Sequence, residues 1–186
     1  MTGRPPKLWP AFDTMALDED LIRDLRSDHA GETGAVWVYK GILAVTGDGG
    51  VREFARAHLA TERQHLDFFE RWLPRHARSR LTPLWRAAGW ALGALPAFFG
   101  PAAIYRTIEA VETFVEDHYQ QQIDKLAQRP EWAPLHTQLQ HFCADEVHHR
   151  DEAGASLTSP PGRAGRLWMR IVEAGSAAGV RAARYL

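Results

Sequence analysis

The fold is decided by the stretch "ATERQHLDF" at residues 60–68 and its counterpart "ADEVHHRDE" at residues 144–152. Both contain the pattern Glu-x-x-His, first as Glu62 and His65 and then as Glu146 and His149. Residues three apart lie on one face of a helix, so each pattern directs a carboxylate and an imidazole to the same point. One such pair arises readily by chance among surface residues. Two of them in one chain indicate a shared site.

A further glutamate precedes the first pair, in "LRSDHAGETGAVWVYKG" at residues 25–41. This Glu32 has Gly31 and Gly34 beside it in a segment that otherwise reads as helix. A glycine inside a helix costs about 1 kcal/mol relative to alanine. We expect these glycines to give clearance beside a ligand, either to a neighbouring helix or to an approaching substrate.

The second pair is preceded by three candidates, Glu109, Glu112 and Glu116. We prefer Glu112 because it best reproduces the spacing of the first half of the chain. Glu32 and Glu62 are 30 residues apart (62 − 32), and Glu112 and Glu146 are 34 apart (146 − 112). The chain therefore repeats one helical-hairpin plan, a Glu followed by Glu-x-x-His.

Apolar residues recur at helical spacing along most of the chain, and alternation of period two is absent over any useful length. The pattern predicts four long helices, with Asp18 as the N-cap of the first, at residues 17–45, 51–73, 104–127 and 132–157. Long helices joined by short loops predict an all-α fold, a ferritin-like four-helix bundle.

The predicted metal ligands are four glutamates and two histidines: Glu32, Glu62, His65, Glu112, Glu146 and His149. Four carboxylates in a bundle core are costly unless they are compensated. Two divalent cations balance their charge, and mixed carboxylate and imidazole ligation suits iron or manganese. We expect Glu62 and Glu146 to bridge the two metals and to be the catalytic carboxylates. Such a ligand set is typical of di-iron carboxylate bundles.

Composition narrows the function classes further. The 186 residues, 45% of them apolar, suffice for a single domain over residues 1–186, and the net charge of −1 gives no electrostatic case for nucleic acid. The only cysteine, Cys143, excludes a multi-cysteine zinc or iron–sulfur site and indicates a reducing compartment. The N-terminal extension, residues 1–17, has no apolar signal core.

An uncharged run of 19 residues, 87–105, lies within a segment that we interpret as an inserted apolar helical hairpin, residues 81–105. Pro96 and Pro101 interrupt the run, which disfavours a simple membrane span. The hairpin either dips into one leaflet or lines an apolar pocket; the alternative is that it only covers the bundle core. The tail, residues 163–186, reads as a basic amphipathic helix, and together the two segments suggest a membrane surface.

The motifs resemble a known family. The segments "DHAGETGA" (28–35), "TERQHL" (61–66), "AVETFVEDHYQQQI" (110–123), "DEVHHRD" (145–151), "PLWRAAGWALGAL" (83–95) and "AAGVRAARYL" (177–186) are similar to the demethoxyubiquinone hydroxylases of ubiquinone biosynthesis. The resemblance covers roughly residues 20 to 186. It implies that Glu32 and His65 bind one iron and Glu112 and His149 the other.

The resemblance also implies a function. The expected enzyme is a di-iron monooxygenase that uses O₂ to hydroxylate a polyprenylated methoxy-methyl-benzoquinol, demethoxyubiquinol. Its two iron ions would receive reducing equivalents from a nicotinamide donor such as NADH. The expected location is peripheral, on the cytoplasmic face of a bacterial cell membrane, in a homo-oligomer or a complex of ubiquinone biosynthesis.

Other readings of the same ligand set remain open. One is a ferritin-like protein that oxidises or stores iron, or another di-iron oxidase; a storage protein predicts a large cage and gives no role to the apolar hairpin. Another is a membrane-associated scaffold that has lost its metals, which the retention of all six ligands disfavours.

Overall fold

The computed structural model describes residues 17–186, so nearly all of the predicted N-terminal extension lies outside the described residues. The fold class is all-α, as the sequence predicts, and residues 17–186 contain no strand. The helices are those of a ferritin-like protein: α1 (Glu19–Val45), α2 (Gly49–Trp72), α3 (Thr82–Ala97), α4 (Pro101–Leu126), α5 (Ala133–Ala155) and α6 (Arg163–Ala183). Two short 3₁₀ helices, η2 (Arg75–Ala77) and η3 (Pro130–Trp132), lie in the connections.

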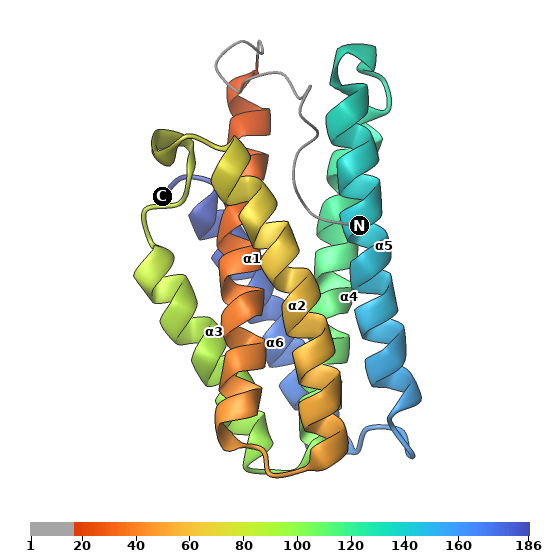
Figure 1. Ribbon diagram of the computed structural model, residues 1–186. Coiled ribbons are helices and arrows are strands. Elements are labelled where there is room, and N and C mark those ends of the chain that lie inside the picture. Colours follow the sequence, from red (N-terminus) through yellow and green to blue (C-terminus); the bar gives the residue numbers. More distant parts are fainter. Residues whose placement is uncertain (1–16) are drawn as a thin grey trace. The chain divides into compact units, whose positions relative to one another are not determined.

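These helices divide between two compact units. The first unit comprises the chain up to Phe98 together with Ala178–Leu186, and it contains the antiparallel hairpin α1–α2 and the inserted helix α3 (Figure 1). The second unit, Phe99–Ala177, contains the hairpin α4–α5 and most of α6. Each unit therefore holds one of the two Glu/Glu-x-x-His repeats.

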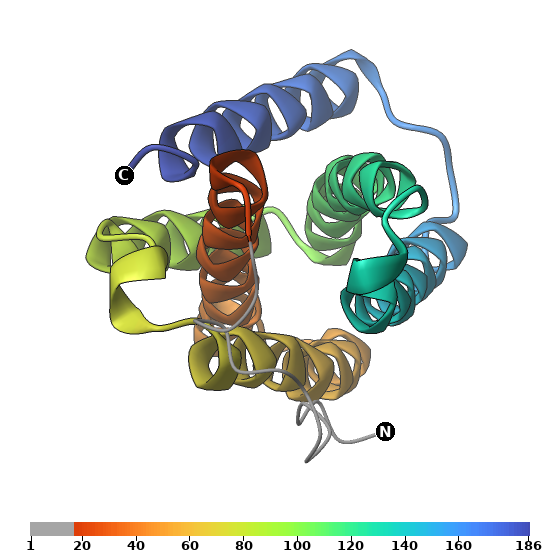
Figure 2. The same ribbon diagram turned by 90° about the horizontal axis from the view of Figure 1, so that it is seen from above.

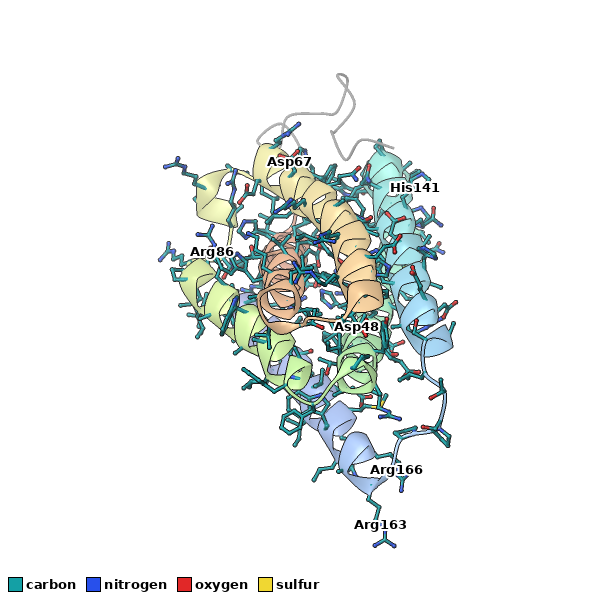
Figure 3. The ribbon with its side chains drawn as sticks, turned by 60° about the horizontal axis from the view of Figure 1, so that its bottom comes forward. Asp48, Asp67, Arg86, His141, Arg163 and Arg166 are labelled. Atoms are coloured by element: carbon teal, nitrogen blue, oxygen red, sulfur yellow. The ribbon has the colours of Figure 1, made fainter. Side chains whose placement is uncertain are left out.

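Both helices of the hairpin α1–α2 begin at an aspartate that caps the helix N-terminus. The Asp18 side chain accepts a hydrogen bond from the Leu21 amide at 2.8 Å, which confirms the predicted N-cap of α1. Asp48, labelled in Figure 3 at the start of α2, does the same for the Val51 amide at 2.9 Å. Such caps satisfy amides that the helix leaves without a partner and typically contribute about 1 kcal/mol each.

Helix α3 packs against α1 through glycines, and Figure 1 shows the two helices side by side. A methyl group on Gly93 would overlap the Val38 carbonyl oxygen, and one on Gly89 would overlap that of Gly34. A methyl group on Gly31 would meet nothing within 4 Å. An added methyl group on Gly34 would likewise meet nothing within 4 Å, so the close approach of α3 depends on Gly89 and Gly93 and not on the expected clearance at Gly31 and Gly34.

The chain turns between α3 and α4 at the predicted break. Gly100 has φ = 92°, a left-handed conformation that glycine adopts without strain, and Pro101 begins α4. The second arm of the inserted hairpin is thus the first turn of α4, which continues for 26 residues as the third long helix. Within residues 17–186, no helix combines the length and apolarity needed to cross a membrane.

The end of the chain returns to the first unit, where Figure 2 shows it beside the start of α1. The Arg184 guanidinium pairs with Asp20 and with the buried Asp24, and the Arg26 side chain donates to the Arg184 carbonyl at 3.0 Å. These contacts anchor the last residues of the chain to α1.

Candidate metal centre

The first unit brings together the predicted ligands of its own hairpin. Glu32 comes from α1, and Glu62 and His65 come from successive positions on one face of α2. The three are at most 4% exposed, and each offers a ligand atom within 4.8 Å of those of the other two. His65 Nδ1 lies 3.6 Å from a Glu32 carboxylate oxygen and 4.0 Å from one of Glu62.

The second unit has the same arrangement. Glu112 on α4 and Glu146 and His149 on α5 are at most 2% exposed, and their ligand atoms also lie within 4.8 Å of one another. His149 Nδ1 is 3.1 Å from a Glu146 carboxylate oxygen. Each hairpin therefore buries two carboxylates and one imidazole at one point.

The structure separates the three candidate glutamates of α4. Glu116 forms an ion pair with Arg150, and the Glu109 carboxylate lies near Gly154, where an added methyl group would be 3.6 Å from it. Both are half-buried, whereas Glu112 is 1% exposed. Only Glu112 of the three lies beside Glu146 and His149.

The chemistry of these donors fits a divalent metal bound by oxygen and nitrogen. Each buried set carries two carboxylates, whose desolvation is costly unless a cation compensates it. No thiolate competes for this role in either set. Burial raises the pKa of the Cys143 thiol, and the nearby Glu146 carboxylate raises it further, so the thiol stays protonated. Glu and His without thiolate suit iron or manganese better than a structural zinc site.

The remaining buried histidines have other surroundings. Burial, together with the nearby Arg78 and Arg86 charges, lowers the pKa of His29 to about 4. His29 is therefore neutral near pH 7. His58 Nδ1 lies 3.3 Å from the Tyr39 hydroxyl, and a nitrogen of the half-buried His118 lies 3.1 Å from the Gln122 amide.

Two interactions close to the ligands were not predicted from the sequence. One is the Tyr39–His58 pair. The other is the ion pair in which Arg150, the residue after His149, bonds both Glu116 and Asp151. Asp151 accepts two hydrogen bonds from the Arg150 guanidinium, at 2.9 and 2.7 Å. The sequence does contain one related pattern: a tyrosine follows Glu32 by seven residues, at Tyr39, and another follows Glu112 by seven residues, at Tyr119.

A family model and several characterised proteins match the chain. The model described as "Ubiquinone biosynthesis protein COQ7" matches residues 19–183. The 3-demethoxyubiquinol 3-hydroxylase of Rhodospirillum rubrum is 40% identical over 132 residues, 69% of this chain and 61% of that protein. The mitochondrial NADPH-dependent 3-demethoxyubiquinone 3-hydroxylase of Mus musculus is 34% identical over 162 residues, 85% of this chain and 74% of that protein.

The match to the Rhodospirillum protein thus spans less than two thirds of its length. A third relative, the mitochondrial 5-demethoxyubiquinone hydroxylase of Saccharomyces cerevisiae, is 33% identical over 156 residues. The family model extends over both Glu/Glu-x-x-His repeats, α3 and α6. The chain belongs to the family of the ubiquinone biosynthesis protein COQ7.

Proposed function

We propose that the two buried sets form one dinuclear iron centre. Glu32 and His65 would bind one iron, Glu112 and His149 the other, and Glu62 and Glu146 would bridge them. The support is the repetition: each hairpin buries the same two carboxylates and one imidazole, and the chain belongs to a family whose characterised members are named hydroxylases. Two divalent cations match the four negative charges.

When bound, the reduced iron pair supplies the activation of O₂, which protein side chains alone do not provide. The chain's own residues hold the metals and control their surroundings. Each imidazole must be neutral to ligate, and the glutamates must be ionised, so metal binding displaces protons from the site. The apolar neighbours of the ligands, such as Ile108 and Phe68, are fully buried and keep bulk water away.

The proposed reaction is hydroxylation of a polyprenylated demethoxyubiquinol ring by O₂, with the second oxygen atom leaving as water. This substrate class rests on the relatives' names, since 3-demethoxyubiquinol 3-hydroxylase is the name of the Rhodospirillum protein. The mouse relative is named NADPH-dependent. For this chain we propose a nicotinamide nucleotide as the class of reductant.

We also propose peripheral binding to the membrane that holds the polyprenyl tail, by a homo-oligomer or a complex of ubiquinone biosynthesis. In the first unit, exposed apolar side chains follow α3 and its end: Leu84, Trp90, Leu95 and Phe98. In the second unit, Leu167 and Ile171 are exposed on α6, and Figure 3 shows Arg163 and Arg166 at the start of that helix pointing away from it. Apolar side chains beside arginines suit an anionic lipid surface.

Genetic complementation tests the proposal. In a bacterial strain that accumulates the demethoxy precursor, this chain should restore ubiquinone. The variant Glu146→Ala should fail at equal protein level. Glu152→Ala, on an exposed position of the same helix, is the matched control and should restore ubiquinone. Restoration by Glu146→Ala, or failure of the unaltered chain when it is expressed and iron-loaded, contradicts the proposal.

A further inference from the structure

A buried phenol and a buried imidazole contact each other in the hairpin α1–α2. Tyr39 is fully buried and His58 is 3% exposed, and the Tyr39 hydroxyl lies 3.3 Å from His58 Nδ1. The Phe54 ring covers His58, with ring centroids 4.1 Å apart. In the tautomer with its proton on Nε2, His58 presents Nδ1 as an acceptor for the phenolic proton.

This pair lies next to the ligands of the same hairpin. Tyr39 follows Glu32 by seven residues, which is two helical turns along the same face of α1, or about 10 Å. His58 precedes Glu62 by four residues, which is one turn along the same face of α2. An electron can cross such a separation within a protein in one step.

The second hairpin repeats the tyrosine but not the histidine on the neighbouring helix; the imidazole beside Tyr119 is that of the preceding residue, His118, with ring centroids 6.3 Å apart. Tyr119 follows Glu112 by seven residues, as Tyr39 follows Glu32, and it is also buried. The residue four before Glu146 is Phe142, where the first hairpin has His58, and its ring centroid lies 6.3 Å from that of Tyr119. A phenyl ring cannot accept a proton. The two hairpins therefore differ at this position: the first has a proton acceptor, His58, and the second has Phe142.

The hydroxyl–imidazole contact at Tyr39 is what suits that tyrosine to oxidation. Removing an electron from a buried phenol without moving its proton leaves an uncompensated positive charge in an apolar core, which is costly. A hydrogen-bonded imidazole removes this cost by taking the proton as the electron leaves. Of these two repeat-related tyrosines, Tyr39 has an imidazole at the matching position on the neighbouring helix.

We propose that Tyr39 and His58 form a redox-active pair that reduces the O₂-derived oxidant when no quinol has reacted with it. This inference rests on the proposed function, because the oxidant is the one that the hydroxylation requires. In the step, the Tyr39 O–H bond breaks, one electron passes to the oxidant and the proton passes to His58 Nδ1. A neutral tyrosyl radical and an imidazolium remain. A quinol then returns one electron, becoming a semiquinone and releasing a proton to solvent, and His58 returns its proton to the Tyr39 oxygen.

Electron paramagnetic resonance tests the pair directly. Protein loaded anaerobically with Fe²⁺ is mixed with O₂ in the absence of quinol and frozen rapidly. We expect an organic radical signal whose hyperfine structure collapses when the protein contains ring-deuterated tyrosine. The signal should persist in the matched control Tyr119→Phe and disappear in Tyr39→Phe. His58→Gln, which keeps an acceptor but cannot hold the proton, should give a lower yield, and added quinol should suppress the signal.

Iron content, O₂ consumption, folding by circular dichroism and quinol hydroxylation are measured on the same samples. If iron-loaded protein consumes O₂ and hydroxylates quinol but shows no tyrosyl signal, the inference is wrong and the proposed function stands. A signal that survives in Tyr39→Phe, or that only Tyr119→Phe removes, also overturns the inference. If the protein binds no iron, both the inference and the proposed function fail.

Discussion

At the scale of single residues, the six buried side chains proposed as ligands oppose the stability of the metal-free protein. Each set holds two carboxylates that are almost completely removed from water. Desolvated carboxylates weaken folding unless a cation or hydrogen bonds compensate them. A metal that binds only the folded protein stabilises it by mass action.

The variant Glu62→Gln separates these two effects because it keeps the shape and removes the charge. We expect metal-free Glu62→Gln to be at least as stable as the unaltered protein. Its unfolding temperature should no longer rise when Fe²⁺ or Mn²⁺ is added. Thermal unfolding with and without metal measures both quantities. Glu70→Gln, at an exposed position of α2, is the control and should keep the metal-dependent rise; the same rise in Glu62→Gln refutes its role as a ligand.

The lowered pKa of His29 leads to a second prediction, on how the free energy of unfolding depends on pH. Its pKa is lowered from 6.5 to about 4 in the folded protein, so between these values the unfolded chain binds a proton that the folded chain does not. Stability therefore falls as the pH drops through this window, by about 1.4 kcal/mol per pH unit for one proton. Urea unfolding of the protein and of His29→Gln across this range should show a shallower fall for the variant. Parallel pH dependences contradict the prediction.

The residues that each hairpin buries together could be predicted from the sequence because their types and helical spacing carry the information. Glu62 with His65, and Glu146 with His149, need only a helix to share a face. The Tyr39–His58 pair could not be predicted this way. Its two members lie on different helices, and their contact depends on the register between α1 and α2, which spacing within each helix does not determine.

At the scale of elements, the close packing of α3 on α1 depends on glycines. Gly41, Gly89 and Gly93 each lie where an added methyl group would overlap backbone atoms of the other helix. Backbone cannot move aside as a side chain can, so the two helix axes would have to separate. Overpacking of this kind typically costs about 1–3 kcal/mol.

We therefore expect Gly93→Ala to lower the free energy of unfolding by about 2 kcal/mol or more. Gly31→Ala is the matched control: it is an exposed position of α1 with nothing within 4 Å of the added methyl group. It should raise stability by up to about 1 kcal/mol, because alanine is the better helix former. Chemical denaturation of both variants measures the difference. Equal effects of the two substitutions contradict the packing described.

The limits of the helices show what local sequence can and cannot predict. Asp18 begins α1 as expected, since a cap is a local interaction. The start of α4 was predicted three residues late: Ile104 was expected, and the helix begins at Pro101. The start of α4 lies within the uncharged run 87–105. The apolar residues of this run continue from α3 into α4 with the same helical spacing, so the sequence pattern does not mark the boundary. The left-handed Gly100 marks the boundary only once its φ angle is known.

At the scale of the whole molecule, the protein exposes large apolar side chains, and its proposed substrate has a polyprenyl tail that lies in a membrane. Phe98 and Phe99 are 72% and 82% exposed. Contiguous exposed apolar side chains, unlike single ones, are typical of contacts with lipid or a partner.

Co-sedimentation with lipid vesicles tests this surface. The protein should bind anionic vesicles more strongly than neutral ones, and salt should weaken the binding. Replacing both Phe98 and Phe99 by serine should reduce binding several-fold while metal content stays unchanged. Circular dichroism monitors folding in the variant. Binding that is equal for the variant and the unaltered protein contradicts a lipid contact at these residues.

We propose that both hairpins contribute to one dinuclear iron centre that hydroxylates a demethoxyubiquinol. A single turnover with isotopically labelled O₂ tests it most directly. Purified protein is loaded with iron, reduced and mixed with demethoxyubiquinol and the labelled gas, and the iron content and product mass are determined. We expect two iron ions per chain and one labelled oxygen atom in the quinol ring, and we expect both to be lost in Glu62→Ala and in Glu146→Ala. Unlabelled product, or full activity in either variant, would contradict it.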